Sequence, residues 1–159
     1  FRDGSLPAIG FFDVLEHLDD EQAFLRQIHG ALAPGGRIYL TVPAGRWLWS
    51  DDDVQAGHFR RYTCSGLRRA LERAGFRPLL VSKIFLPLPL PLFLWRSLPS
   101  LFGHRRLPAQ SRSSLHRPRG RPLMDRFWNW ELARLARGQG IPCGTSCLSV
   151  AELSPSAHA

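Results

Sequence analysis

The chain has 159 residues, of which 44% are hydrophobic, so it is long enough to bury a core and is not a disordered chain. Its net charge of +8 comes almost entirely from arginine, and no acid occurs between Glu72 and Asp125. Such a basic half suits phosphate-bearing partners or an anionic membrane surface, and a merely solvated loop has the same composition. Three cysteines without regular spacing exclude a disulfide scaffold and favour a reducing, cytoplasmic compartment.

The first predicted element is a short strand at Leu6–Phe12. Its residues are apolar on both faces, as in parallel strands that helices cover on either side. Pro7 has no backbone N–H to donate to a neighbouring strand, so an alternative is that the strand begins at Ala8.

A helix and a second strand follow. Asp19, with Gln22 three residues later, forms a capping-box pattern, and apolar residues then recur at helical spacing. The turn Ala33–Gly36 ends this helix. The β-branched segment Arg37–Pro43 predicts the second strand. Strand, helix and strand joined by short links form a βαβ unit, so the two strands should be parallel.

Residues 44–62 are predicted to form a long loop rich in Trp, Asp, His and Arg. Thr63 is a suitable N-cap for a helix whose apolar face continues to Ala74. Gly75 supplies the left-handed residue that ends it. Arg77–Phe85 is then predicted to be the third strand.

The remaining segments alternate between irregular and regular structure. In Leu86–Trp95, prolines at every second position exclude an α-helix, and the apolar run is shorter than the roughly 20 residues of a membrane span. Residues 104–121, with six arginines and no acid, are predicted to form a loop. A helix is predicted at Leu123–Arg137 and a last strand at Gly144–Leu153. The tail Ser154–Ala159 is predicted to be disordered.

Five short segments occur in a fixed order along the first 76 residues: FRDGS, FDVLEHLDD, ALAPGGRIYLTVP, GHFRRYT and RALERAGF. Together they resemble the carboxyl-terminal half of class I S-adenosylmethionine-dependent methyltransferases, most closely the group that contains the ubiquinone-type O-methyltransferases. The later segment IPCGTSCLSVAEL is similar to the final strand of the family. The resemblance therefore places residues 1–153 in one methyltransferase domain, with a basic proline-rich insert at about 86–121.

The resemblance implies a Rossmann-like α/β fold with a seven-stranded, mostly parallel sheet in the order 3-2-1-4-5-7-6. This chain would supply strands four to seven, namely Leu6–Phe12, Arg37–Val42, Arg77–Phe85 and Gly144–Leu153. The glycine-rich cofactor loop of the family would precede Phe1. We therefore expect the chain as given to be an inactive fragment that does not bind the cofactor alone.

The implied cofactor is S-adenosylmethionine. By resemblance, Phe12 contacts it and Asp13 lies near its methionine end. The carboxyl ends of the strands border the ligand crevice in folds of this type, which is where this pair stands. A purely structural role for Phe12 as a core aromatic is compatible with the same position.

Asp13, Glu16, His17 and His58 are the candidate catalytic and metal-binding residues. The spacing acid-x-x-acid-His resembles a segment that holds a divalent metal in some relatives, where a later histidine completes the site. Glu16, His17 and His58 would then be the ligands, and the metal would lower the pKa of the acceptor hydroxyl. Alternatively, His17 or His58 is a general acid–base or contacts the substrate. In a third interpretation, Glu16 caps backbone amides and His17 bonds a neighbouring loop.

Four residues of the 44–62 loop are candidate substrate contacts. Arg60, Arg61 and Tyr62 could hold a phosphate or carboxylate of the substrate. Alternatively, Arg61 pairs with the acids at Asp51–Asp53. Trp47 could form an aromatic wall for the acceptor, or could anchor the loop to the domain.

The resemblance implies methyl transfer to a hydroxyl or amine of a small molecule. The basic insert leaves two alternatives. One is an RNA-modifying or nucleic-acid-binding protein, which is disfavoured because the insert lacks interleaved aromatic residues for base stacking. The other is a peripheral membrane module at an anionic surface, acting on a lipid-linked acceptor.

Overall fold

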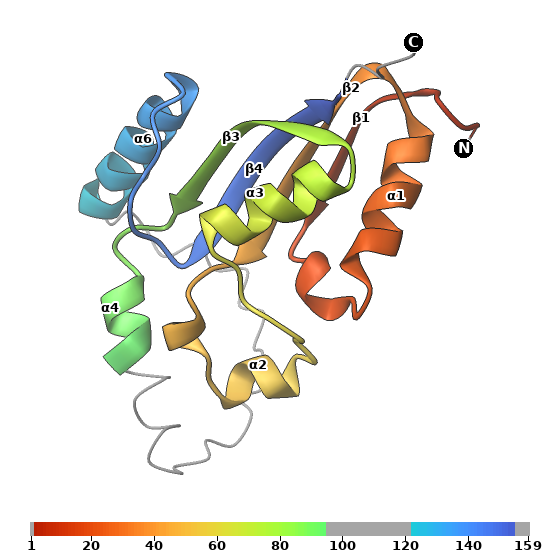
Figure 1. Cartoon of the computed structure of the whole chain (residues 1–159). Coiled ribbons are helices and arrows are strands. Elements are labelled where there is room, and N and C mark those ends of the chain that lie inside the picture. Colours follow the sequence, from red (N-terminus) through yellow and green to blue (C-terminus); the bar gives the residue numbers. More distant parts are fainter. Residues whose placement is uncertain (1, 95–121, 155–159) are drawn as a thin grey trace.

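The computed structural model describes residues 2–94 and 122–154, which form a four-stranded sheet with helices packed beside it (Figure 1). In chain order the elements are β1 (Leu6–Phe12), η1 (Leu15–His17), α1 (Glu21–Ala31), β2 (Leu32–Pro43), η2 (Arg46–Leu48), α2 (Asp51–Gln55), α3 (Cys64–Arg73), β3 (Phe76–Ile84), α4 (Pro89–Leu92), α6 (Pro122–Ala136) and β4 (Ser146–Leu153). Most of the predicted basic insert, residues 95–121, and the predicted disordered tail from Pro155 onward lie outside the described residues.

The order of the sheet is β1-β2-β4-β3. This confirms the predicted order of strands four, five, seven and six. β1 and β2 pair in parallel, as the βαβ unit requires, whereas β4 runs antiparallel to both of its neighbours. A mixed α/β sheet with one reversed strand is thus the fold class of the described residues.

One face of the sheet carries the core. Along β2, Ile38, Leu40 and Val42 are fully buried, whereas Arg37 before them and Tyr39 between Ile38 and Leu40 are exposed. The buried face packs against Leu25 of α1 and against apolar residues of α3, which Figure 1 shows beside the sheet. The period-two alternation of buried and exposed residues is that of a strand with one covered face.

The prediction that β1 is buried on both faces is wrong for the described residues. Phe11 is buried at 7% exposure, but Phe12 is 58% exposed. Their side chains point to opposite sides of the strand, and in the part of the chain that the structure describes, it is the Phe11 side that packs on a helix, through Phe24 of α1. β1 does begin at Leu6, and Pro7 is accommodated by an irregularity in the pairing with β2 between Leu6 and Ala8.

Two other boundaries differ from the prediction. Asp20, rather than Asp19, caps α1 by accepting a hydrogen bond from the Ala23 amide. Gln22 does not close a capping box, because its side chain donates to the Ala70 carbonyl of α3. β2 also begins at Leu32, so the predicted turn at Ala33–Gly36 is part of the extended chain.

Two segments predicted to be irregular contain short helices. Within residues 44–62, Arg46–Leu48 and Asp51–Gln55 are helical. α4 forms at Pro89–Leu92 despite its prolines. A helix of four residues consists only of a first turn, whose amides have no intrahelical partner, so proline costs no hydrogen bond there.

Two glycines are required by the backbone. Gly75 has φ +86°, which confirms the predicted left-handed end of α3. A Cβ at Gly144 would lie 2.1 Å from the Ile84 carbonyl oxygen, so only glycine lets the chain enter β4 beside β3. Within the described part of the chain, no helix is long and apolar enough to cross a membrane.

Candidate active site

The chain turns sharply where β1 ends. Asp13 has φ +53°, a left-handed conformation that aspartate tolerates better than most residues. Its amide donates to the Thr41 carbonyl, and the Thr41 hydroxyl donates to its carboxylate over 3.1 Å. This anchor on β2 directs the following 3-10 turn, Leu15–His17, back across the end of the sheet.

Glu16 is buried at the centre of this turn, with 1% of its surface exposed. Its Oε2 atom has no hydrogen-bond partner among the described residues. Burial raises the pKa of Glu16 above its usual value, and the nearby Asp13 adds to the effect, while a backbone hydrogen bond and the two histidines only partly oppose it. Glu16 is therefore a carboxyl group poised to hold a proton.

The structure brings His17 and His58 together beside Glu16. The two imidazole rings lie 4.7 Å apart, edge to face. Phe59 donates its amide to the Glu16 carbonyl over 2.7 Å, which holds the loop carrying His58 against the turn carrying His17. Two segments 41 positions apart in the sequence thus place three titratable side chains in one cluster.

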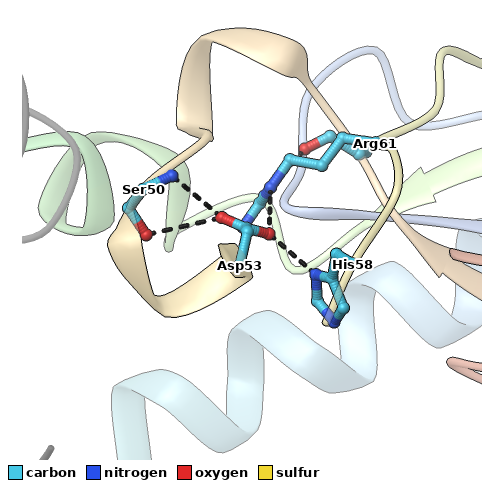
Figure 2. A network of polar contacts seen from close by, with 5 residues as sticks. Ser50, Asp53, His58 and Arg61 are labelled. Atoms are coloured by element: carbon cyan, nitrogen blue, oxygen red, sulfur yellow. Dashed lines mark hydrogen bonds and ion pairs between the residues drawn. The ribbon is translucent and has the colours of Figure 1, made fainter. Parts of the chain in front are cut away.

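A buried carboxylate, Asp53 of α2, holds His58 from the other side (Figure 2). Asp53 is 1% exposed and lies 2.9 Å from Nδ1 of His58. It also accepts hydrogen bonds from the Ser50 amide at 2.9 Å and from Nε and Nη2 of Arg61 at 2.8 and 3.0 Å. Burial alone would raise the pKa of Asp53, but hydrogen bonds from Arg61 and His58 outweigh it and hold that pKa below its usual value.

A pocket of about 280 Å³ opens onto this cluster. Asp13, Glu16 and His17 line one side of it and His58 another. Thr145, just before β4, also lines it. Because Nδ1 of His58 faces Asp53, Nε2 is the nitrogen left for a ligand or a proton. The pocket is thus lined by two imidazoles and a buried carboxyl group.

The candidate substrate contacts are already engaged with protein atoms. Arg60 donates to the carbonyls of Leu18 and Asp19 and pairs with Glu21 at 3.3 Å. Arg61 is bidentate on Asp53, as the alternative interpretation of the sequence had it. A contact of either arginine with a substrate stays a prediction.

The three aromatic candidates for ligand contact differ in exposure: Tyr62 is buried, whereas Phe12 and Trp47 are exposed. Tyr62 is 6% exposed, and its hydroxyl donates to Glu21. Burial, together with the Glu21 carboxylate, raises the pKa of Tyr62 far above its usual value. Phe12 and Trp47 are 58% and 51% exposed. Phe12 is the last residue of β1, and Trp47 packs on Phe93, with ring centroids 5.4 Å apart.

A second, larger pocket of about 520 Å³ lies next to the first and shares Arg61 with it. Its lining consists of Arg46, Trp49, Phe59, Arg60 and Arg61. Arg46 is exposed, whereas the other two arginines are tied to carboxylates. The space therefore has aromatic walls and a cationic rim.

Sequence reasoning missed the role of Asp53, and it missed Thr41 and Thr145 altogether. Asp53 appeared only as one of three acids that could pair with Arg61. A usable signal was the pattern Ser50-x-x-Asp53 before a helical turn, followed by His58 five residues later. No local pattern marks Thr41 or Thr145, because they reach the site only through strand pairing.

The cluster has the right residue types for a metal but a wide spacing. The donor atoms of Glu16, His17 and His58 lie within 4.8 Å of one another. Ligands on a tetrahedral zinc ion are about 3.4 Å apart, given bond lengths of about 2.1 Å. The three side chains would have to close in to bind a metal in this way.

A family profile described as a methyltransferase domain matches residues 2–81, half of the chain. The chain belongs to the methyltransferase domain family. The match includes β1, the cluster with Glu16 and His58, and most of β3. No curated protein matches this methyltransferase domain in sequence.

Solved structures share its fold at low identity. Phosphoethanolamine N-methyltransferase 2 of Haemonchus contortus, in complex with S-adenosylmethionine, is 17% identical with a TM-score of 0.54. The match covers 98% of this chain and 35% of that one. A SAM-dependent methyltransferase of Archaeoglobus fulgidus is also 17% identical, with a TM-score of 0.52, over 95% of this chain and 61% of that one.

The same fold also supports other chemistry. The [4+2]-cyclase SpnF is 16% identical with a TM-score of 0.51, over 97% of this chain and 53% of that one. This methyltransferase domain thus spans less than two thirds of the length of these structures. At such identities the likeness shows the fold, here a Rossmann-like class I methyltransferase fold, and function must be argued from the site.

Proposed function

We propose that this chain takes part in S-adenosylmethionine-dependent methyl transfer to a hydroxyl or amine of a small molecule, with His58 as the general base. The observation that carries the proposal is the buried Asp53 on Nδ1 of His58, at 2.9 Å, in a pocket that His58 shares with His17 and Glu16. Membership of the methyltransferase domain family supports the reaction class.

The Asp53–His58 pair suits removal of a proton from the acceptor. With its pKa lowered, Asp53 stays a carboxylate and accepts a hydrogen bond from Nδ1–H, so Nε2 keeps its lone pair. When Nε2 takes the proton of the acceptor, the carboxylate stabilises the imidazolium that forms. Proton transfer by a positioned side chain of this kind contributes about 10²- to 10⁴-fold in rate.

The cofactor would lie against the carboxyl end of β1. When bound, S-adenosylmethionine supplies a methyl group on a sulfonium centre. Phe12 offers an exposed ring there, and Gly10 leaves room for it, because a Cβ at Gly10 would lie 3.3 Å from that ring. The Asp13 carboxylate suits the ammonium group of the cofactor's methionine end. The described residues thus fit one side of a cofactor site.

The acceptor would occupy the pocket at His58. Its volume of about 280 Å³ suits a small molecule rather than a polymer. A larger acceptor would extend into the neighbouring space, where Trp49 and Phe59 offer apolar walls and Arg46 an exposed cation. An acceptor with a planar or apolar body and an anionic end fits that lining. His17 is then a second contact with the reacting group.

The test is steady-state kinetics of the complete protein with S-adenosylmethionine and a panel of small hydroxyl and amine acceptors. His58→Gln should lower kcat/KM by at least 100-fold, and Asp53→Asn should flatten the rise of activity with pH. His29→Gln, a histidine that packs on Phe76 far from the pocket, is the matched control. A His58→Gln variant with kcat/KM within threefold of the wild type would refute the role of His58.

A second function is favoured by one surface. Trp47, Leu90 and Leu94 are each more than half exposed, and Trp47 packs on Phe93 beside α4. We propose that this apolar surface touches an anionic membrane, so that a lipid-linked acceptor reaches the site. Leu90→Glu combined with Leu94→Glu should reduce co-sedimentation with phosphatidylserine vesicles. Equal sedimentation of variant and wild type would exclude the membrane contact.

A further inference from the structure

Two of the three cysteines lie in direct contact. Cys64 is the first residue of α3, and Cys147, 83 positions later, is the second residue of β4, an inner strand of the sheet. Their Sγ atoms are 3.6 Å apart, and both are free thiols. Cys143, the third cysteine, is also a free thiol but belongs to the segment before β4. The fold thus pairs two thiols that no sequence spacing connects.

The two thiols have different surroundings. Cys147 is fully buried, whereas Cys64 is partly exposed. The hydrogen bond with the Cys147 thiol lowers the pKa of Cys64 most strongly, burial opposes it, and Lys83 and Arg68 lower it further, to about 7. The position of Cys64 at a helix N-terminus favours a thiolate as well. The Cys147 pKa is raised, because its thiol faces Cys64 and is buried.

Of the two thiols, Cys64 therefore combines accessibility with reactivity. Cys64 is the thiol that solvent reaches and the one that ionises near neutral pH. Cys147 is inaccessible but within contact distance of it. A thiolate exposed to oxidant beside a second, protected thiol is the arrangement in which a sulfenic acid is captured before it oxidises further.

We propose that Cys64 and Cys147 form a redox-active pair that closes to an intramolecular disulfide when a hydroperoxide reaches Cys64. The Cys64 thiolate attacks the hydroperoxide, its sulfur is oxidised to a sulfenic acid, and the O–O bond breaks with release of alkoxide or hydroxide. The Cys147 sulfur then attacks the sulfenic sulfur and displaces hydroxide, which leaves with the thiol proton as water. The disulfide forms, and the hydroperoxide is reduced to an alcohol or water.

Closure requires only a small movement. The sulfurs must approach by about 1.5 Å to reach the disulfide bond length of about 2.05 Å. The disulfide would tie the start of α3 to β4. Ser146 and Thr145, next to Cys147 along the chain, line the pocket at His58, and Tyr62 is two residues before Cys64. Oxidation would therefore act beside the lining of the candidate active site, although the pair itself does not depend on the proposed function.

Peptide mapping of the protein after treatment with hydrogen peroxide tests the pair. The intact mass should fall by two hydrogen atoms, and non-reducing digestion should link the Cys64 peptide to the Cys147 peptide, while Cys143 stays open to alkylation. The Cys143→Ser variant should behave as the wild type. A cross-link that contains Cys143, or Cys64 oxidised to sulfinic acid while Cys147 stays free, would overturn the proposal.

Single variants separate the roles. In Cys147→Ser, the sulfenic acid on Cys64 should persist and react with dimedone; in Cys64→Ser, Cys147 should resist both peroxide and alkylation in the folded protein. Without any substitution, iodoacetamide at pH 7 should modify Cys64 about tenfold faster than a thiol of ordinary pKa, and Lys83→Met should slow it. Dimedone labelling of Cys147 in place of Cys64, or equal rates for wild type and Lys83→Met, would contradict the assignment.

Discussion

Two carboxyl groups in this protein are equally buried, yet their pKa values are shifted in opposite directions. Asp53 and Glu16 each expose 1% of their surface. Asp53 receives hydrogen bonds from a backbone amide, an arginine and a histidine, and its pKa is lowered. Glu16 has an oxygen without a partner among the described residues, and its pKa is raised. Burial penalises the charge of both groups, so the supply of hydrogen-bond donors decides the direction in which each pKa is shifted.

His58 stands between these two regions. Its Nδ1 faces Asp53 in the paired network, and its ring contacts His17 in the cluster with Glu16. The paired side holds the imidazole in place, whereas the other side has the Glu16 Oε2 atom, which has no partner among the described residues, and an open pocket. One imidazole ring is thus held by Asp53 on one side and lines the pocket on the other.

The largest effect is expected from breaking the paired side. Asp53→Ala should lower the free energy of unfolding by about 3–5 kcal/mol, because Arg61 and His58 then lose their buried partner. Urea denaturation measures this. Asp19→Ala, which removes an exposed carboxylate, is the control and should change stability by less than about 0.5 kcal/mol. Equal losses in the two variants would show that the Asp53 network is not stabilising.

Acidification should erode the same network. The pKa of folded Asp53 lies below its unfolded value of about 4, so its stabilisation is complete above that pH and is lost as the pH falls through the folded pKa. The stability difference between the wild type and Asp53→Asn should therefore shrink as the pH falls below about 4. Thermal melts of both proteins from pH 7 to pH 3 measure it, and a constant difference would contradict the assignment.

The unpaired side should respond in the opposite sense. The pKa of folded Glu16 is above its unfolded value, so ionisation costs the wild type stability as the pH rises from the unfolded through the folded pKa. Glu16→Gln removes this titration and should match the wild type to within about 1 kcal/mol at low pH and equal or exceed it at pH 7. A variant much less stable than the wild type at pH 7 would mean that Glu16 is a structural anion.

The smallest effect is expected from removal of metal. The donor atoms of Glu16, His17 and His58 are spaced more widely than tetrahedral ligands. Treatment of the complete protein with a chelator should therefore change methyl transfer by less than about twofold. Loss of activity that Mg²⁺, Mn²⁺ or Zn²⁺ restores, with metal found by elemental analysis, would show that the cluster contracts around an ion.

Much of the fold was predictable from local patterns. The parallel pair β1 and β2, the left-handed Gly75 and the order of the four strands follow from strand periodicity, turn chemistry and resemblance to the family. These features depend on neighbours in the sequence or on a shared motif. The short helix α2 and the true cap of α1 at Asp20 were missed, because several acids in a row offer equivalent local choices.

In the candidate site, too, some features follow from the sequence and others from the tertiary structure alone. The sequence by itself determined which chemistry-bearing residues the chain has, and it placed Glu16, His17 and His58 in one hypothesis. Only the tertiary structure decided that Asp53 holds His58, that Glu16 has an oxygen without a partner in the described ranges and that Cys64 contacts Cys147. A pKa and a contact depend on burial and on partners brought from distant segments, and no local pattern records either.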